Sequence, residues 1–115
     1  MLYLVKSFKE DKDTSGKNNP PLSEEGVQFG KQLKLRNNVL SFDCCYTSYL
    51  LKDFSSAIIV AGDKLIIERV HELDDEKKEV ISFIKRLPLD KKILIVASDG
   101  VISLIDENFK CIILK

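Results

Sequence analysis

The run Ile93-Leu94-Ile95-Val96-Ala97 is the feature that most restricts the fold of this chain. Five consecutive apolar residues are typical of a short strand that is buried on both of its faces. Such strands occur almost only in sheets that carry helices on both sides, so the run predicts an α/β architecture. A chain of 115 residues is long enough for one domain with a genuine core. We therefore expect a single domain over residues 1–115.

The rest of the chain alternates between strand-like and helix-like patterns. We expect strands at 1–5, 42–46, 65–67, 93–97 and 109–114, and helices at 23–36, 48–61, 74–87 and, as a short helix, 101–105. This order predicts a three-layer α/β sandwich with a mostly parallel central sheet. Because the connection before the last strand is short, we expect that strand to pair antiparallel at an edge.

Two local features qualify this outline. Residues 9–21 are polar and contain Gly and Pro, which predicts a loop. Gly26 and Gly30 lie four residues apart on the apolar face of the first helix. Glycine inside a helix costs roughly 1 kcal/mol relative to alanine, so we expect the pair to permit close packing of this helix on the sheet.

The charge and cysteine content exclude several classes of protein. The 18 basic residues balance the 18 acidic ones, and the two signs are interleaved, so no basic field exists to attract nucleic acid. The apolar runs are too short for a signal peptide or a membrane span. Cys44, Cys45 and Cys111 form no C-x-x-C motif, which favours buried free thiols in a reducing cytoplasm over disulfides or a zinc site. No metal or cofactor is implied.

Polar residues follow the ends of three predicted strands. Lys6-Ser7 follows the first strand, Ser48 the second and Asp99 the fourth. The carboxyl ends of parallel strands meet at one edge of the sheet, where ligands bind in α/β folds. Lys52 lies one turn into the helix after Ser48, on the same side, and Glu72, after the third strand, could reach the same rim. The sequence therefore predicts a site at this edge.

Four blocks of the chain resemble the histidine phosphatase superfamily, which includes the phosphoglycerate mutases. The blocks are Leu2-Tyr3-Leu4-Val5-Lys6-Ser7, Pro21-Leu22-Ser23-Glu24-Glu25-Gly26, Tyr46-Thr47-Ser48-Tyr49-Leu50-Leu51-Lys52 with Ser56-Ala57, and the strand 93–97 with Ser98-Asp99-Gly100. The first is similar to the family's Arg-His-Gly strand end and the last to its Ser-His-Gly motif. The blocks occur in the family's order and span nearly the whole chain. The resemblance implies the family's fold in its small, cap-less form.

The resemblance also indicates where the family's catalytic groups would lie. The nucleophilic histidine falls on Ser7, the second pocket histidine on Asp99, and the two phosphate-binding arginines on Lys6 and Lys52. Glu72 is the counterpart of the proton-donating carboxylate. The family mechanism passes through phosphohistidine and needs a nucleophilic imidazole. An unassisted serine hydroxyl does not replace it.

The charges at these positions predict a pocket that neutralises itself. Asp99 and Glu72 would repel a bound phosphate, and a pair of like unit charges at ~4 Å costs about 4 kcal/mol in an effective dielectric near 20. The attraction between the phosphate and one lysine is of comparable size, so one lysine would only offset this repulsion. We therefore expect Lys6 or Lys52 to lie within salt-bridge distance of Asp99.

The leading functional prediction is a catalytically inactive domain. It would act as a protein-interaction module or as a weak binder of a small phosphate-like anion through Lys6, Lys52 and Ser48. The alternative is a residual phosphatase on small phosphate esters, with Ser7, Glu72 and Asp99 as its catalytic groups. A third reading is a structural remnant without a ligand. His71 is the only histidine and lies on a polar connection outside both motif positions, so it is interpreted as a surface residue.

Overall fold

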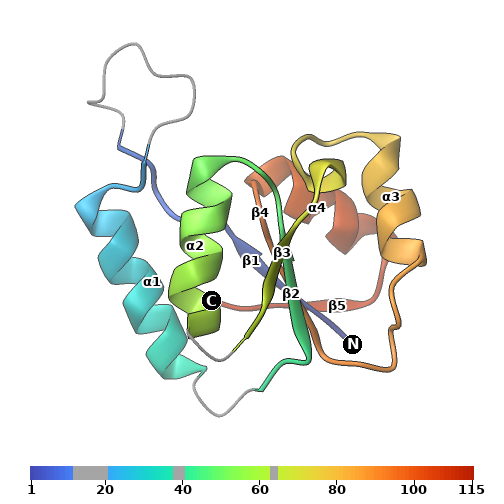
Figure 1. Ribbon diagram of the computed structural model, residues 1–115, viewed down its shortest axis with the longest axis horizontal. Coiled ribbons are helices and arrows are strands. Elements are labelled where there is room, and N and C mark those ends of the chain that lie inside the picture. The colour runs from blue at the N-terminus through green and yellow to red at the C-terminus, as the bar shows by residue number, and fades with distance from the viewer. Residues whose placement is uncertain (12–20, 38–40, 63–64) are drawn as a thin grey trace.

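The computed structural model describes residues 1–11, 21–37, 41–62 and 65–115, and most of the loop predicted at 9–21 lies outside these ranges. Helices and strands alternate along the chain (Figure 1). In order, the elements are β1 (Leu2–Lys6), α1 (Glu24–Arg36), β2 (Cys44–Thr47), α2 (Leu51–Ala61), β3 (Ile67–Arg69), a 3₁₀ helix (His71–Leu73), α3 (Lys78–Lys85), β4 (Ile93–Ala97), α4 (Asp99–Asn108) and β5 (Cys111–Ile113).

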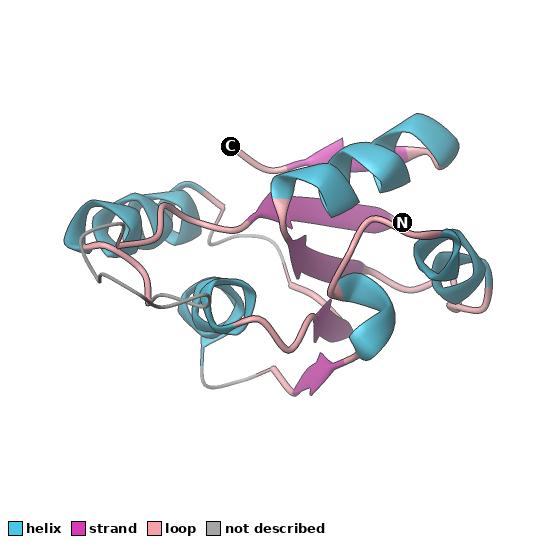
Figure 2. Ribbon diagram, turned by 90° about the horizontal axis from the view of Figure 1, so that it is seen from above, coloured by secondary structure: helices cyan, strands magenta, loops and turns pink. Residues whose placement is uncertain are grey.

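The five strands form one parallel sheet in the order β3-β2-β4-β1-β5. From β1 the chain moves to β2 and β3 at one edge of the sheet, and then returns through β4 to β5 at the other edge. Because crossovers between parallel strands are right-handed, this reversal puts α1 and α2 on one face and α3 and α4 on the other (Figure 2). The predicted three-layer α/β sandwich is confirmed.

The predicted antiparallel edge strand is wrong. β5 pairs parallel with β1, with Cys111 opposite Leu2 and Ile113 opposite Leu4. The cause is α4, which extends from Asp99 to Asn108 instead of covering only 101–105. Its ten residues make a helix about 15 Å long, long enough to carry the chain back to the amino end of the sheet. The next strand therefore runs in the same direction as β4.

β3 and α3 also differ from their expected bounds. β3 is shifted from 65–67 to Ile67–Arg69 because its hydrogen bonds are set by pairing with Cys45–Thr47 of β2. α3 begins at Lys78 rather than Asp74. The Asp74 carboxylate instead accepts the backbone N–H of Tyr49 at 2.7 Å, and the Asp75 carboxylate accepts the N–H of Glu76. These acids serve a tertiary contact and a turn, not the first turn of a helix.

β4 is the centre of the core, as its sequence predicts. All of its five side chains are fully buried. Ile93, Ile95 and Ala97 pack toward α3 and α4, and the two residues between them pack toward α1 and α2. Fully burying one such aliphatic side chain contributes about 1.5–3 kcal/mol. Within the described ranges, no helix is both long and apolar enough to cross a bilayer.

The two glycines of α1 do not face the sheet strands, which corrects their expected role. A Cβ atom on Gly26 would overlap the backbone of Lys9, and one on Gly30 would overlap the ring of Phe8 and approach Ile59 of α2. The glycines therefore bring α1 against the segment that follows β1 and against α2. A pocket remains between α1 and the ends of β1 and β5 on this face.

Candidate functional site

The carboxyl ends of β1, β2 and β4 meet at one edge of the sheet. The pairing sets Lys6 opposite Ala97 and Thr47 opposite Val96. Ser7, Ser48 and Ser98 follow these strand ends, and the N–H of Ser7 donates to the carbonyl of Ala97 at 2.9 Å. The structure thus gathers the strand-end residues that the sequence selects.

Lys6 and Asp99 form the ion pair expected from the charge pattern. The Lys6 Nζ lies 2.9 Å from the Asp99 Oδ1, and the two side chains are 52% and 79% exposed. An exposed pair of this kind contributes about 0–1 kcal/mol to stability. Its larger effect is on the site, because the Lys6 ammonium is directed toward a carboxylate.

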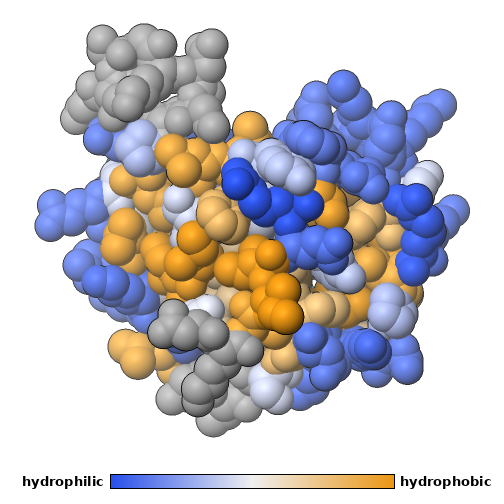
Figure 3. All heavy atoms as spheres, viewed as in Figure 1, coloured by the Kyte–Doolittle hydropathy of each residue, from blue (hydrophilic) through white to orange (hydrophobic). Residues whose placement is uncertain are grey.

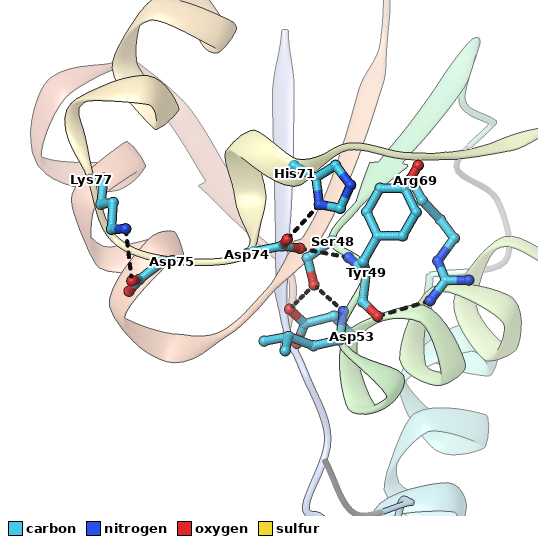
Figure 4. Close-up of polar contacts among 9 residues, drawn as sticks. Ser48, Tyr49, Asp53, Arg69, His71, Asp74, Asp75 and Lys77 are labelled. Atoms are coloured by element: carbon cyan, nitrogen blue, oxygen red, sulfur yellow. Dashed lines mark hydrogen bonds and ion pairs between the residues drawn. The ribbon is translucent and has the colours of Figure 1, made fainter. Parts of the chain in front are cut away.

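Asp53 is the buried carboxylate of this edge, and it lies outside the set of predicted site residues. Its side chain is fully buried. Its Oδ2 accepts a hydrogen bond from the Ser48 hydroxyl at 2.6 Å (Figure 4) and a longer one from the Ser98 hydroxyl at 3.2 Å. Ser7, at the end of β1, lies beside this carboxylate, and its hydroxyl acts to lower the pKa of the acid. Serines from three strand ends thus converge on one acid; we call these four residues the serine–aspartate cluster.

Opposing effects act on the pKa of Asp53. Burial raises the pKa because it disfavours the charged form. The hydrogen bonds from Ser48 and Ser98, the Ser7 hydroxyl and the nearby charge of Lys52 oppose this effect, and the net result is a raised pKa. The cluster therefore holds a carboxylate whose ionised form is disfavoured in the folded protein.

A sequence signal for Asp53 does exist. The buried positions of α2 are Asp53, Ser56, Ala57 and Val60, which follow helical i, i+3, i+4, i+7 spacing. Asp53 is thus the first member of a sheet-facing stripe. Acids are common in the first turn of a helix because they interact favourably with the helix dipole. Asp53 therefore does not stand out in the sequence as a buried residue.

Hydroxyl groups also tie the neighbouring backbone to α2 and β4. The Thr47 hydroxyl donates to the Val96 carbonyl at 2.7 Å. The Ser56 hydroxyl accepts the N–H of Phe8 at 2.9 Å and donates to the Lys52 carbonyl at 2.6 Å. These contacts fix the segment after β1 against α2. α2 itself begins at Leu51, later than the expected residue 48, and has no side-chain cap.

The other two predicted site residues, Lys52 and Glu72, do not join the Lys6–Asp99 ion pair. Lys52 is half-buried in the first turn of α2 and has no ion pair within residues 1–11, 21–37, 41–62 and 65–115. The carboxylate of Glu72 lies 3.1 Å from the Arg86 guanidinium, at the end of α3. The structure therefore pairs Glu72 with α3 and not with Lys6 or Lys52.

His71 lies beyond the end of β3 and is 75% exposed, as a surface residue should be. Its ring stacks on Tyr49 with centroids 3.9 Å apart, and its Nδ1 lies 2.9 Å from the Asp74 carboxylate (Figure 4). The Arg69 guanidinium lies over the rings of Tyr49 and Phe54, with its Cζ 4.9 and 4.2 Å from the two ring centroids. The histidine thus has its own partners, away from the two motif positions.

The three thiols are free, and their environments make them weak nucleophiles. Burial raises the pKa of Cys45 to about 12, and burial with the adjacent Asp106 raises that of Cys111 to about 11. Burial also raises the pKa of Cys44. Only Cys45 is fully buried; the other two are half-buried. Among the described residues, no group of three His, Cys, Asp or Glu side chains could hold a metal ion.

Solved structures with this architecture include three phosphate-ester enzymes. The phosphoglycerate mutase of Bacillus anthracis superposes with a TM-score of 0.78 at 14% identity, covering 92% of this chain and 78% of the mutase. The fold is that of the phosphoglycerate mutase-like histidine phosphatases. The alpha-ribazole phosphatase of Shigella flexneri gives 0.77 at 21% identity, covering 91% and 77%. The phosphoserine phosphatase of Entamoeba histolytica gives 0.72 at 14% identity, covering 90% and 77%.

Comparisons based on sequence gave a different result. Neither a scan against protein-family models nor a search of curated proteins found a match. A likeness at these identities shows the shared fold. The chemistry of the site must therefore be argued from the residues of this chain.

Proposed function

We propose that this chain is a non-catalytic domain of the histidine phosphatase superfamily that acts as a protein-interaction module. The observation that carries the proposal is the pair of side chains at the ends of β1 and β4. Ser7 and Asp99 occupy the two positions where the family resemblance calls for histidines, and Asp99 is engaged with Lys6 at 2.9 Å. Phosphohistidine chemistry needs an imidazole that is nucleophilic near neutral pH, and the single histidine lies at the end of β3.

The charge of the strand-end site supports the same proposal. Lys6 and Lys52 face two carboxylates, Asp53 and Asp99, so their formal charges cancel when all four are ionised. A phosphate dianion would have to displace Asp99 from Lys6 and approach the buried Asp53. Lysine also lacks the planar fork that binds phosphate through two parallel hydrogen bonds. Tight anion binding is therefore not expected here.

An exposed apolar surface supports a role in protein contact. Leu51 and Ile58 of α2 are 37% and 48% exposed, and Ile66, directly before β3, is 86% exposed. Figure 3 shows apolar surface gathered over this side of the molecule. Larger contiguous apolar patches mark interaction sites on soluble proteins. We propose a protein partner at this surface, in a reducing cytoplasm where the three thiols stay free.

A residual phosphatase is the second candidate, and one contact favours it. Ser7 lies beside Asp53, whose pKa is raised by burial. A carboxylate in this position could accept the Ser7 proton as a general base while the hydroxyl oxygen attacks phosphorus and the P–O bond to the leaving alcohol breaks. In this route Lys52, which has no ion pair among the described residues, would hold the transferred group, but a lysine lacks the planar fork that grips phosphate.

Turnover of p-nitrophenyl phosphate separates the two candidates. We expect no turnover by the wild type above that of Ser7→Ala, with the exposed Ser103→Ala as the matched control. We expect activity to appear only when Ser7→His and Asp99→His are combined, together with Lys6→Arg and Lys52→Arg if phosphate binding is also too weak. Wild-type turnover that is lost in Ser7→Ala and Asp53→Asn, but kept in Ser103→Ala, would overturn the non-catalytic proposal.

A phosphate titration followed by thermal unfolding tests the anion-binding alternative. A ligand that binds only the folded state raises the melting temperature, and the rise grows with the ratio of ligand concentration to Kd. We expect the wild type and the double variant Lys6→Ala/Lys52→Ala to respond equally to phosphate. A larger shift in the wild type would assign anion binding to this site in place of protein contact alone.

A further inference from the structure

A pocket of about 360 Å³ lies between α1 and the ends of β1 and β5. α1, on one side of it, rests on the segment after β1 and on α2. α2 covers the β2–β4 part of this face, so the part near β5 stays open beneath α1. The volume falls within the range of small-molecule sites, which is roughly 300–1,000 Å³.

The walls of the pocket are mainly apolar. They include Phe8, Phe29, Leu33 and Leu114. The rings of Phe8 and Phe29 meet edge to face with centroids 5.7 Å apart. Phe29 is 48% exposed, whereas Phe8, Leu33 and Leu114 are buried. The interior is therefore a ready apolar surface with an aromatic residue at its opening.

The charged side chains around the pocket are predominantly basic. Lys6, Lys9 and Lys115 line it with a single acid, Glu25. The Lys9 Nζ lies 2.8 Å from the Glu25 Oε2, and both side chains are exposed. A ligand with an apolar body and one negative charge would match both parts of the pocket. A neutral ligand would use only the walls, and a dianion would meet the Glu25 carboxylate at the rim.

We propose that this pocket binds an amphiphilic monocarboxylate, namely a medium-chain aliphatic acid. Its chain would lie along Phe8, Leu33 and Leu114, and its carboxylate would bind Lys9 in competition with Glu25. Lys6 and Ser7 also line the pocket. The inference does not depend on the proposed function, because the contacts assigned to the ligand are those with Phe8, Leu33, Leu114 and Lys9.

Binding is tested with octanoate below its micelle-forming concentration, by titrating the full chain and recording amide chemical shifts. We expect saturable shifts at Phe29, Leu33 and Leu114, with weaker binding of octan-1-ol, which has a similar chain and no charge. The absence of saturable shifts at these three residues would overturn the proposal. So would equal affinity for octanoate and octan-1-ol.

Two exposed substitutions should move the affinity in opposite directions. Lys9→Gln removes the cation and should weaken octanoate binding about threefold, the size expected of one exposed ion pair. Glu25→Gln releases Lys9 from its partner and should strengthen binding about threefold. Glu24→Gln, one position away and not lining the pocket, is the matched control.

The variants also separate specific from general effects. Binding of octan-1-ol should be the same in all of them, since none changes the apolar walls. Equal octanoate affinity in Lys9→Gln, Glu25→Gln and Glu24→Gln would overturn the assignment of the carboxylate to Lys9. Phosphatase activity in the wild type would refute the proposed function and leave this result standing.

Discussion

Two carboxylates at the same edge of the sheet have opposite environments. Asp99 is 79% exposed and pairs with Lys6 at 2.9 Å. Asp53 is fully buried, accepts hydrogen bonds from serines at the ends of β2 and β4, and lies beside a third serine at the end of β1. The exposed pair occupies a position of the family motif, whereas the buried acid belongs to none of the motif positions.

The comparison shows that the two acids have different roles: Asp99 affects the charge that a ligand meets, and Asp53 affects the stability of the fold. An exposed ion pair is solvated and contributes little to stability, but it determines the charge that a ligand meets. A buried carboxylate beside the hydroxyl groups of three strand ends links these ends and α2, and losing it leaves buried polar groups without a partner. Substitutions at the two acids should therefore affect different properties.

The largest expected effect is the loss of stability in Asp53→Ala. Removing the acceptor leaves the buried Ser48 hydroxyl and the half-buried Ser98 hydroxyl without this partner, which should cost about 2 kcal/mol in the free energy of unfolding. Asp99→Ala should cost less than about 0.5 kcal/mol. Urea unfolding at neutral pH measures both, and equal losses would contradict the distinction between the two acids.

A smaller, pH-dependent effect follows from the raised pKa of Asp53. The ordinary pKa is 3.8, and burial raises the value in the folded protein. The neutral form is then favoured by folding, so this contribution to stability is fully present below the ordinary pKa and is lost as the pH rises through the folded pKa.

Asp53→Asn removes that titration and isolates it from the other acids. The stability of the variant relative to the wild type should therefore increase as the pH rises from about 3 toward 7. Urea unfolding of both proteins across this range measures the change. A relative stability that falls with pH would mean that the serine hydrogen bonds lower the pKa of Asp53 below its ordinary value.

The smallest expected effect on stability is that of Asp99→Asn. It should change the free energy of unfolding by less than about 0.5 kcal/mol, because the broken pair is exposed. Its effect on ligand binding should be larger, since Lys6 is released and the site gains one positive charge. We expect phosphate to bind a few-fold more tightly, measured as a greater rise in melting temperature.

The exposed Asp90→Asn is the control for that substitution, because it makes the same chemical change outside the site. It should leave the response to phosphate as it is in the wild type. A similar response in Asp99→Asn and Asp90→Asn would show that the ion pair does not limit anion binding.

Much of the fold could be predicted because it depends on short apolar patterns. The uninterrupted run at 93–97 requires cover on both faces, and the alternation of strands and helices then leaves few architectures. The direction of β5 could not be predicted in the same way. It depends on the length of α4, whose first turn begins at the polar residues 98–100, where the apolar pattern gives no helical signal.

The strand-end residues Lys6, Ser7, Ser48 and Asp99 could be placed at one edge from sequence, because parallel strands bring their carboxyl ends together. The position of the Glu72 side chain could not be predicted in the same way, since a residue on a connection is positioned by the charge that lies opposite it. In the structure that charge is Arg86, directly after α3.

By itself, the sequence determined the α/β class and the central position of β4. These follow from residue identity and local spacing alone. Only the tertiary structure decided that Asp53 is buried beneath three serines, that Lys6 pairs with Asp99, and that a pocket lies between α1 and the ends of β1 and β5. Burial and pairing depend on which side chains from distant segments pack together, and local spacing does not specify those contacts.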